Sequence, residues 1–214
     1  MYGTMRLLHP ESRGFYEALV MEECIQRHLR PLHLHHPETH DHSLRVGLRA
    51  IDLGYANGLE GRVLRTLGYA ALMHDRGKTG VPRYILAREG EVTEEEMEIM
   101  RGHVRLGFML LSDFPNPKVR VGMVGHHEHT NHPYPRNGKE RRQTIRNKSD
   151  RRNPDEEARR IGEIIAIADM FDALHSKRCY REPLSPDEIA KILAKQFKGD
   201  PQYIDQVLQW CERN

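Results

Sequence analysis

Apolar positions along this chain recur mostly at intervals of three and four residues, which is the period of an amphipathic helix. Leu44, Leu48, Ile51 and Tyr55 follow this spacing and predict one buried stripe on a helix that begins near Glu38. The sequence contains no hairpin dipeptide between alternating β-branched runs. The pattern therefore predicts an all-α fold, organised as a single compact helical bundle domain.

Capping residues and prolines define further helices. A Ser or Thr followed three residues later by Glu is a capping box, and proline favours the first turn of a helix but interrupts its interior. Residues 156–176 are apolar nearly all round and predict a buried helix. The other expected helices are residues 12–29, ending before Pro31, residues 60–74, one capped by Thr93 and Glu96, one opened by Pro117 and running to about His129, and one capped by Ser185 and Glu188.

Composition narrows the class of protein. A length of 214 residues predicts one domain, and 38% hydrophobic residues predict a modest core. Lys and Arg (33) nearly balance Asp and Glu (31). This balance excludes a protein whose entire surface is basic and binds nucleic acid. Residues 139–152 hold seven basic and two acidic residues. We interpret this segment as a solvated loop and do not predict a nucleic-acid partner. The alternative is that the positive charge of the segment attracts a nucleotide or RNA.

The chain carries no membrane or export signal in its pattern. No apolar run approaches the ~18 residues of a membrane span, and the first residues lack a charged-then-apolar layout. Cys24, Cys179 and Cys211 are odd in number and widely spaced, which fits a reducing compartment. These features predict a cytoplasmic protein with no membrane partner. The 14 histidines fall mostly in a few clusters and direct attention to metal chemistry.

Two histidine clusters come from the first half of the chain. Glu38 and His42 are spaced i, i+4, so their side chains share a helix face and could reach one ion; the alternative is a solvated helix start. His74-Asp75 ends an apolar stripe, where a buried carboxylate needs a cation. A core histidine followed by a helix-capping aspartate is the alternative there. Lys78 could bring a positive charge to a bound anion, or be a surface lysine.

The second half adds further candidates. His103 lies at the edge of a buried helix face, where a satisfied core histidine is the alternative. His126 and His127 are adjacent and end a helix. Asp169 interrupts the apolar stretch IIAIADMF, so a metal or an arginine must neutralise it. Asp172 follows on nearly the same face, with a surface ion-pair set as the alternative.

Taken together, these residues predict a metal centre. Nitrogen and oxygen ligands without sulfur suit two or more iron- or manganese-type ions. A carboxylate that bridges two ions ~3.5–4 Å apart would lower the pKa of a shared water and leave positions for phosphate oxygens. The implied reaction is hydrolysis of a phosphoester. The potential ligands are Glu38, His42, His74, Asp75, His103, His126, His127 and Asp169.

These residues stand in strings that resemble the HD-GYP family, the subgroup of HD-superfamily phosphohydrolases that cleaves cyclic di-GMP. The matching strings are HSLRV (42–46), HDRGKTGVPRYIL (74–86), VTEEEMEIMRGH (92–103), HHE (126–128) and IAIADMFDALHSKRCYREPLSP (165–186). The resemblance begins near Glu38 and implies an HD-type helical bundle. It divides the chain into an N-terminal helical extension, 1–37, and an HD-GYP-like metal phosphohydrolase domain, 38–214.

The resemblance also implies a role for each matching residue. One metal would be held by His42, His74, Asp75 and Asp169, with Asp75 bridging to a second metal held by His103, His126 and His127. Glu38 matches the acidic position of members with a third metal. Catalytic roles fall to His74, Asp75 and Lys78, of which Lys78 would hold a phosphate oxygen, and the dinucleotide would contact Asp172, Arg178 and Arg181.

The activity implied is hydrolysis of cyclic di-GMP to linear pGpG, and on to GMP, in bacterial second-messenger signalling. It would use two or three divalent ions, iron or manganese, and its partners would be a cyclic dinucleotide, signalling proteins and a second copy of the chain as a homodimer. One departure concerns the loop after HHE, where Pro133 replaces the glycine of Gly-Tyr-Pro and cannot supply a positive φ. The alternatives are therefore a phosphodiesterase for another cyclic nucleotide and a catalytically weak receptor.

Overall fold

The fold is described by a computed structural model over residues 6–134, 156–176 and 183–211. Helices form the regular structure of this part of the chain, apart from an isolated bridge between Thr130 and Phe197. The all-α prediction is confirmed. The elements are α1 (Ser12–Val20), α2 (Glu23–His35), α3 (Pro37–Ala56), α4 (Gly61–Leu72), η1 (Arg76–Gly80), α5 (Arg83–Leu86), α6 (Glu94–Arg101), α7 (His103–Leu110), α8 (Pro117–Val124), η2 (Gly125–His127), α9 (Glu156–His175), α10 (Pro186–Gln196), α11 (Gln202–Leu208) and η4 (Gln209–Cys211).

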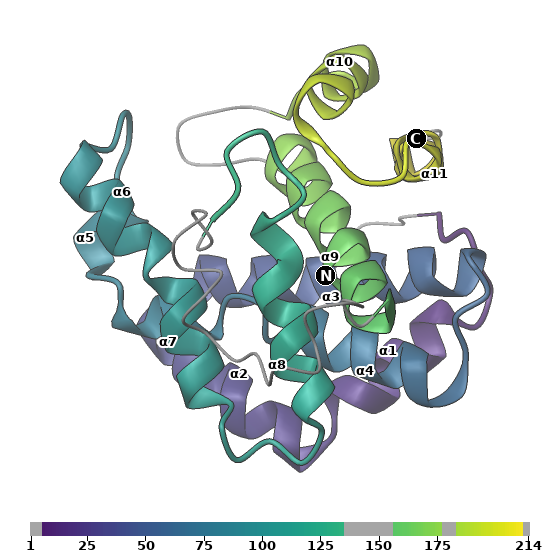
Figure 1. Ribbon diagram of the computed structural model, residues 1–214, viewed down its shortest axis with the longest axis horizontal. Coiled ribbons are helices and arrows are strands. Elements are labelled where there is room, and N and C mark those ends of the chain that lie inside the picture. Colours follow the sequence, from purple (N-terminus) through teal and green to yellow (C-terminus); the bar gives the residue numbers. More distant parts are fainter. Residues whose placement is uncertain (1–5, 135–155, 177–182, 212–214) are drawn as a thin grey trace.

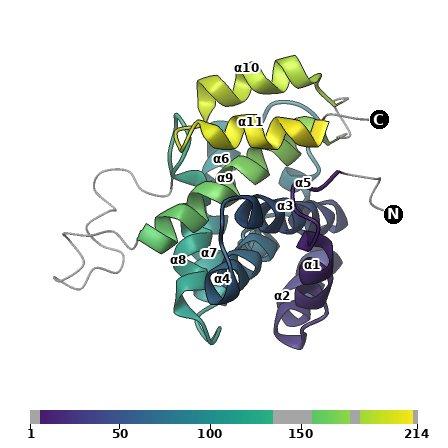
Figure 2. The same cartoon turned by 90° about the vertical axis from the view of Figure 1, so that its right-hand side faces the viewer.

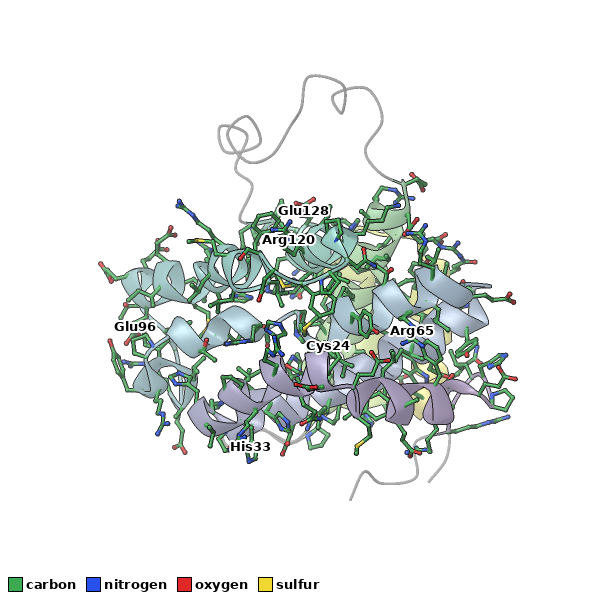
Figure 3. The ribbon with its side chains drawn as sticks, turned by 90° about the horizontal axis from the view of Figure 1, so that it is seen from below. Cys24, His33, Arg65, Glu96, Arg120 and Glu128 are labelled. Atoms are coloured by element: carbon green, nitrogen blue, oxygen red, sulfur yellow. The ribbon has the colours of Figure 1, made fainter. Side chains whose placement is uncertain are left out.

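Helix α3 is the centre of the bundle, and it packs against α1, α2, α4 and α9. Figure 1 shows α3 running behind α8 and α9, with α7 beside α8. Helices α10 and α11 lie side by side against α9 at one end (Figure 2), and α2 runs along one edge of the molecule (Figure 3). Within the described residues, no helix combines the length and apolar character that crossing a membrane requires.

One predicted helix is broken, and its expected end is displaced, where the sequence gives little warning. The helix expected over residues 12–29 is two helices, because Glu22 adopts an extended conformation between them (φ −66°, ψ 133°). The Glu22 side chain is drawn to α4, where its carboxylate accepts hydrogen bonds from Arg65 and Tyr69. The expected end before Pro31 was wrong: α2 continues through the proline to His35, and burial of Leu32 accompanies the continuation.

The capping predictions are confirmed at three helix starts. Thr93 with Glu96 and Ser185 with Glu188 form reciprocal capping boxes, and Pro117 opens α8. The helix that begins after Thr93 ends at Arg101, however, and a new helix starts at His103. The helix expected to run to about His129 ends at Val124 and tightens into the short helix η2, which carries His126 and His127.

One buried carboxylate ties both ends of the described chain to α3. Asp52 has no exposed surface, and it accepts hydrogen bonds from the backbone N–H groups of Leu8 (2.8 Å) and His9 (3.0 Å). It also accepts hydrogen bonds from the hydroxyl of Ser12 (2.7 Å) and from the indole N–H of Trp210 (2.8 Å). Four donors therefore depend on a single side chain for their hydrogen bonds.

Replacing this carboxylate should destabilise the whole fold. Asp52→Ala leaves four buried or half-buried donors without their acceptor, which should lower the free energy of unfolding by about 3 kcal/mol or more. Urea unfolding followed by circular dichroism measures the change. Asp205→Ala, at an exposed position of α11, is the matched control and should stay within about 0.5 kcal/mol of the parent protein. Equal losses in both variants would contradict the role of Asp52.

Candidate metal centre

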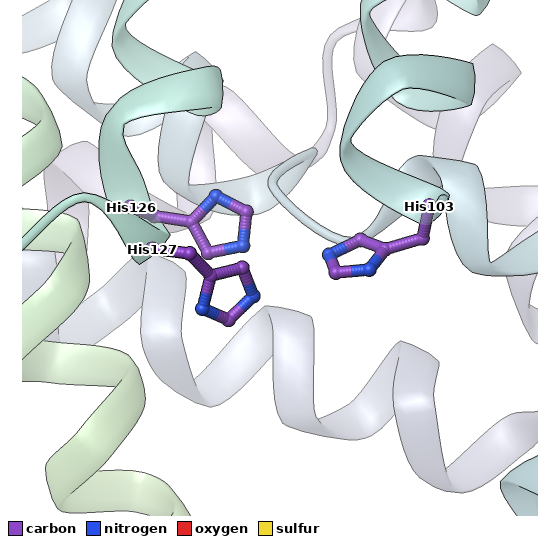
Figure 4. Close-up of side chains that lie close together, drawn as sticks. All are labelled: His103, His126 and His127. Carbon is purple, nitrogen blue, oxygen red and sulfur yellow. The ribbon is translucent and has the colours of Figure 1, made fainter. Parts of the chain in front are cut away.

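Seven of the predicted ligands converge between α3, the turn before η1, α7, η2 and α9. Histidines 74, 103 and 126 are almost completely buried, at 0 to 1% exposed, and Asp75 is 1% exposed. Figure 4 shows the side chains of His126 and His127, which belong to η2, pointing towards that of His103 at the start of α7. The chain thus brings together groups that are far apart in the sequence. The seven are His42, His74, Asp75, His103, His126, His127 and Asp169.

The imidazoles are held by their outer nitrogens. Nδ1 of His74 lies 2.8 Å from the carbonyl oxygen of Ala71, and Nδ1 of His103 lies 2.6 Å from that of Met100. His126 makes the same contact with the carbonyl three residues before it. Since a carbonyl can only accept, Nδ1 carries the proton in each ring, and Nε2 is left as a lone-pair donor that a metal can use.

The inner nitrogens face one another and the two carboxylates. Nε2 of His74, His103 and His126 is buried in each case without a hydrogen-bond partner. Asp75 lies among them, with Oδ2 3.4 Å from Nε2 of His74 and Oδ1 3.4 Å from Nε2 of His103. Three buried nitrogens without partners are rare in a folded protein, and their presence around a carboxylate is what a metal centre requires.

Burial keeps His103 and His126 neutral. It lowers the pKa of His103 to about 4 and that of His126 to about 3, even though nearby carboxylates act in the opposite direction. Burial alone would raise the pKa of Asp75, but the neighbouring His74 ring and the Lys78 ammonium group outweigh it and hold this pKa well below its ordinary value. At neutral pH the centre therefore offers lone pairs and anionic oxygens, which is the protonation state that metal binding needs.

The ligands form overlapping groups. His42, His74 and Asp75 bring one ligand atom each within 4.8 Å of one another, and so do His74, His126 and Asp169, and His103, His126 and His127. His74 and His126 each belong to two groups, so the three groups make one continuous cluster. Neutral imidazole and carboxylate donors fit divalent ions, and the cluster has enough ligands for more than one.

Glycines allow the ligand-bearing segments to approach closely. A Cβ on Gly77 would lie 1.8 Å from the backbone oxygen of His103, so only glycine lets η1 rest against α7. Gly125 and Gly162 meet in a similar way, since a Cβ on Gly162 would lie 3.0 Å from Cα of Gly125. The second contact seats η2 directly on α9. Backbone contacts of this kind fix the distance between the histidines and the aspartates.

Lys78 lies beside the centre. Its Nζ lies 2.6 Å from Oδ2 of Asp75, and its side chain is 21% exposed. Glu38 does not join: it is exposed in the first turn of α3 and belongs to none of the ligand groups formed by the described residues. Arg178 and Arg181, like the basic segment 139–152 and Cys179, lie outside the described residues.

Asp172 is placed differently from a dinucleotide contact. Its carboxylate is fully buried, and Oδ2 accepts a hydrogen bond from Nδ1 of His42 (2.7 Å). Arg45 donates to both of its oxygens (2.8 and 3.0 Å), and Arg49 donates to Oδ1. A carboxylate saturated in this way has no oxygen facing a ligand. It orients His42, whose Nε2 lies 2.9 Å from Asp169.

The sequence interpretation missed this arginine clamp and one aromatic residue. Arg49 is a charge inside the buried stripe of α3, and a buried charge needs a partner, so the signal was present. Tyr134 stacks on the ring of His127, with centroids 4.2 Å apart, and the Arg101 guanidinium lies 5.8 Å from the centre of the Tyr134 ring. The loop that follows HHE and contains Pro133 is anchored by a hydrogen bond from the backbone N–H of Lys198 to the carbonyl oxygen of His129 (2.9 Å).

The chain belongs to the HD domain family, whose model matches residues 39–174. Relatives include a cyclic di-GMP phosphodiesterase of Thermotoga maritima, 36% identical over 155 residues, and the cyclic di-GMP phosphodiesterase response regulator RpfG of Xanthomonas campestris, 34% identical. Each match covers 71% of this chain and 38% of the relative. A 3′3′-cGAMP-specific phosphodiesterase of Vibrio cholerae is 30% identical over 82% of this chain and 32% of its own length.

The chain thus spans about two fifths of the length of the first two curated relatives. Among solved structures, the HD domain of the Listeria monocytogenes phosphodiesterase PgpH in complex with cyclic di-AMP matches with a TM-score of 0.56 and 21% identity. The match covers 86% of this chain and 93% of that one. It confirms the predicted HD-type helical fold.

The buried histidines should make the metal-free protein sensitive to acid. His103 and His126 have pKa values of about 4 and 3 in the folded protein and about 6.5 when unfolded, so the unfolded chain binds more protons between these limits. We expect the free energy of unfolding of chelator-treated protein to fall as the pH is lowered from about 6.5 towards about 4. His126→Leu should make this fall shallower, whereas His132→Ala, at an exposed position, should not. A slope that His126→Leu leaves unchanged would refute this origin.

Asp172, held by two arginines, should influence metal affinity indirectly, because it orients His42. Asp172→Asn removes the charge that Arg45 and Arg49 share and loosens the orientation of His42, so metal affinity should fall by roughly 10- to 100-fold. Competition with a chromogenic chelator, at a temperature where the variant is folded, measures the affinity. Asp187→Asn, exposed at the start of α10, is the control and should bind metal as the parent does. Parental affinity in Asp172→Asn would show that other contacts position His42.

Proposed function

We propose that this chain is an HD-GYP-type metal-dependent phosphodiesterase that hydrolyses cyclic di-GMP to linear pGpG. The observation that carries the proposal is the set of three buried Nε2 atoms without partners, arranged around Asp75. The named activities of the relatives from Thermotoga and Xanthomonas support the substrate class. A cyclic dinucleotide carries negatively charged phosphodiesters, and Lys78 with the proposed metal ions would supply the positive charge that their hydrolysis needs.

We further propose two ions, iron or manganese, held by the seven clustered residues. The donors are imidazole nitrogens and carboxylate oxygens without thiolate, which suits these metals. Bound divalent ions supply Lewis acidity, which polarises a phosphoester and lowers the pKa of a water. Glu38 has no part in this proposal because its side chain is exposed.

The protein residues divide the remaining work. Asp75 presents one oxygen towards His74 and the other towards His103, which suits a bridging position. The ammonium group of Lys78 contacts Asp75 and is partly exposed, and it would hold a phosphate oxygen of a bound substrate. Asp172, through His42, keeps one ligand in orientation, and Tyr134 covers the outer face of His127.

A specific observation favours a second substrate, a mixed purine dinucleotide such as 3′3′-cGAMP. The loop that carries Tyr134 has proline where the HD-GYP pattern has glycine, and the tyrosine lies over a predicted ligand. One relative from Vibrio cholerae is named for 3′3′-cGAMP. The two substrates share the phosphodiester and differ in one base, so they test the base-binding side of the site.

The decisive experiment is turnover by protein purified without oxygen, with its metal content counted by elemental analysis. Cyclic di-GMP, 3′3′-cGAMP and cyclic di-AMP are incubated separately and the products are separated by chromatography. We expect linear dinucleotide from at least the first, with a rate that falls by more than about a hundredfold in Asp75→Asn. Asp113→Asn, at an exposed position, should keep the parental rate. Metal-loaded protein that leaves all three substrates intact would replace the phosphodiesterase proposal with a receptor.

A further inference from the structure

A second group of potential ligands lies at the corner between α2 and α3. His33 is in the last turn of α2, and His40 and Asp41 are in the first turns of α3. One ligand atom from each of the three lies within 4.8 Å of the others. The group shares no residue with the buried centre, and Figure 3 shows His33 on the outer side of the molecule.

The two rings come from different helices and approach closely. The centroids of His33 and His40 are 4.7 Å apart, with an interplanar angle of 69°. The helices that carry them are joined by His36, which is extended (φ −153°, ψ 97°), and by Pro37 at the first position of α3. Because proline fixes φ, this corner is stiff and holds the two histidines at a set separation.

Asp41 and His40 present their ligand atoms side by side. Oδ1 of Asp41 lies 2.9 Å from Nδ1 of His40, a separation at which both atoms can ligate one ion. Zinc held by this pair would take the place of the proton between the two atoms. The His40 side chain is 18% exposed and the Asp41 side chain 57% exposed. A partly covered ring beside an accessible carboxylate gives an ion both a fixed ligand and an entry path.

The negative charge of Asp41 makes this corner favourable for a cation. The carbonyl end of α2 attracts positive charge, whereas the amino end of α3 repels it, so the two helix dipoles oppose each other. The negative charge of Asp41 is in direct contact with His40 and decides the balance. Glu38, also in the first turn of α3, adds negative charge to the same helix end.

We propose that His33, His40 and Asp41 bind a zinc ion at the surface, separate from the buried centre. Two imidazoles and a carboxylate are ordinary zinc ligands, and water completes the coordination. The exposed position and the small number of ligands distinguish this site from the buried cluster. Zinc there links α2 to α3 across the Pro37 corner and therefore stabilises the folded chain, because the unfolded chain does not hold these ligands together.

The site is tested by counting zinc, independently of any enzymatic activity. Parent protein, the double variant His33→Ala/His40→Ala and the control His132→Ala are dialysed against one zinc-buffered solution and measured by elemental analysis. We expect the double variant to bind one zinc per chain fewer than the parent, and His132→Ala to match the parent. Equal zinc in parent and double variant would overturn the proposal, as would an equal loss in His132→Ala.

Two further measurements guard against indirect effects. His33→Ala alone changes an exposed side chain, so it should fold normally and still weaken zinc binding at this site by at least about tenfold. His126→Ala impairs the buried centre, and adding the double substitution to it should remove one more zinc. If the zinc count of His126→Ala does not change when His33 and His40 are also replaced, the zinc lost elsewhere belonged to the buried centre and the corner site does not exist.

Discussion

The structure depends on an unfavourable concentration of polar ligand atoms inside an apolar bundle. Imidazole nitrogens without partners and two carboxylates occupy space that leucine and isoleucine side chains could fill at a lower cost in free energy. Two features of the backbone stabilise this arrangement. Carbonyl oxygens accept hydrogen bonds from the outer imidazole nitrogens, and glycines allow the segments that carry the candidate ligands to come into contact. A divalent cation held by the same nitrogens and oxygens would resolve this conflict, and its binding would then be coupled to folding.

The centre has two layers that meet different demands. The inner layer supplies donors to an ion, and the outer layer fixes which nitrogen each ring presents. For three histidines the outer partner is a backbone carbonyl, which no substitution can remove. For His42 it is a side chain, Asp172, itself held by two arginines. His42 is therefore the candidate ligand whose orientation depends on side chains and not on the backbone.

Much of the fold was predictable because local signals agree with the final packing. Periodicity and capping boxes located α3, α6, α9 and α10, and the charge interruption at Asp169 marked the site. The failures have physical reasons. The break at Glu22 follows from long-range contacts with α4, and α2 tolerates Pro31 because neighbouring leucines are buried. The environment of Asp172 depends on Arg49, a contact between residues 123 positions apart that no local pattern records.

The carboxylate of Asp52 links the two ends of the described chain to the candidate metal centre. Segments near both ends are hydrogen-bonded to that one side chain, and it lies on the same helix as His42, ten residues further along. A shift of α3 along its axis would therefore strain these hydrogen bonds and move His42 relative to the histidines on the other elements. The helix that holds both ends of the described chain also carries a candidate ligand.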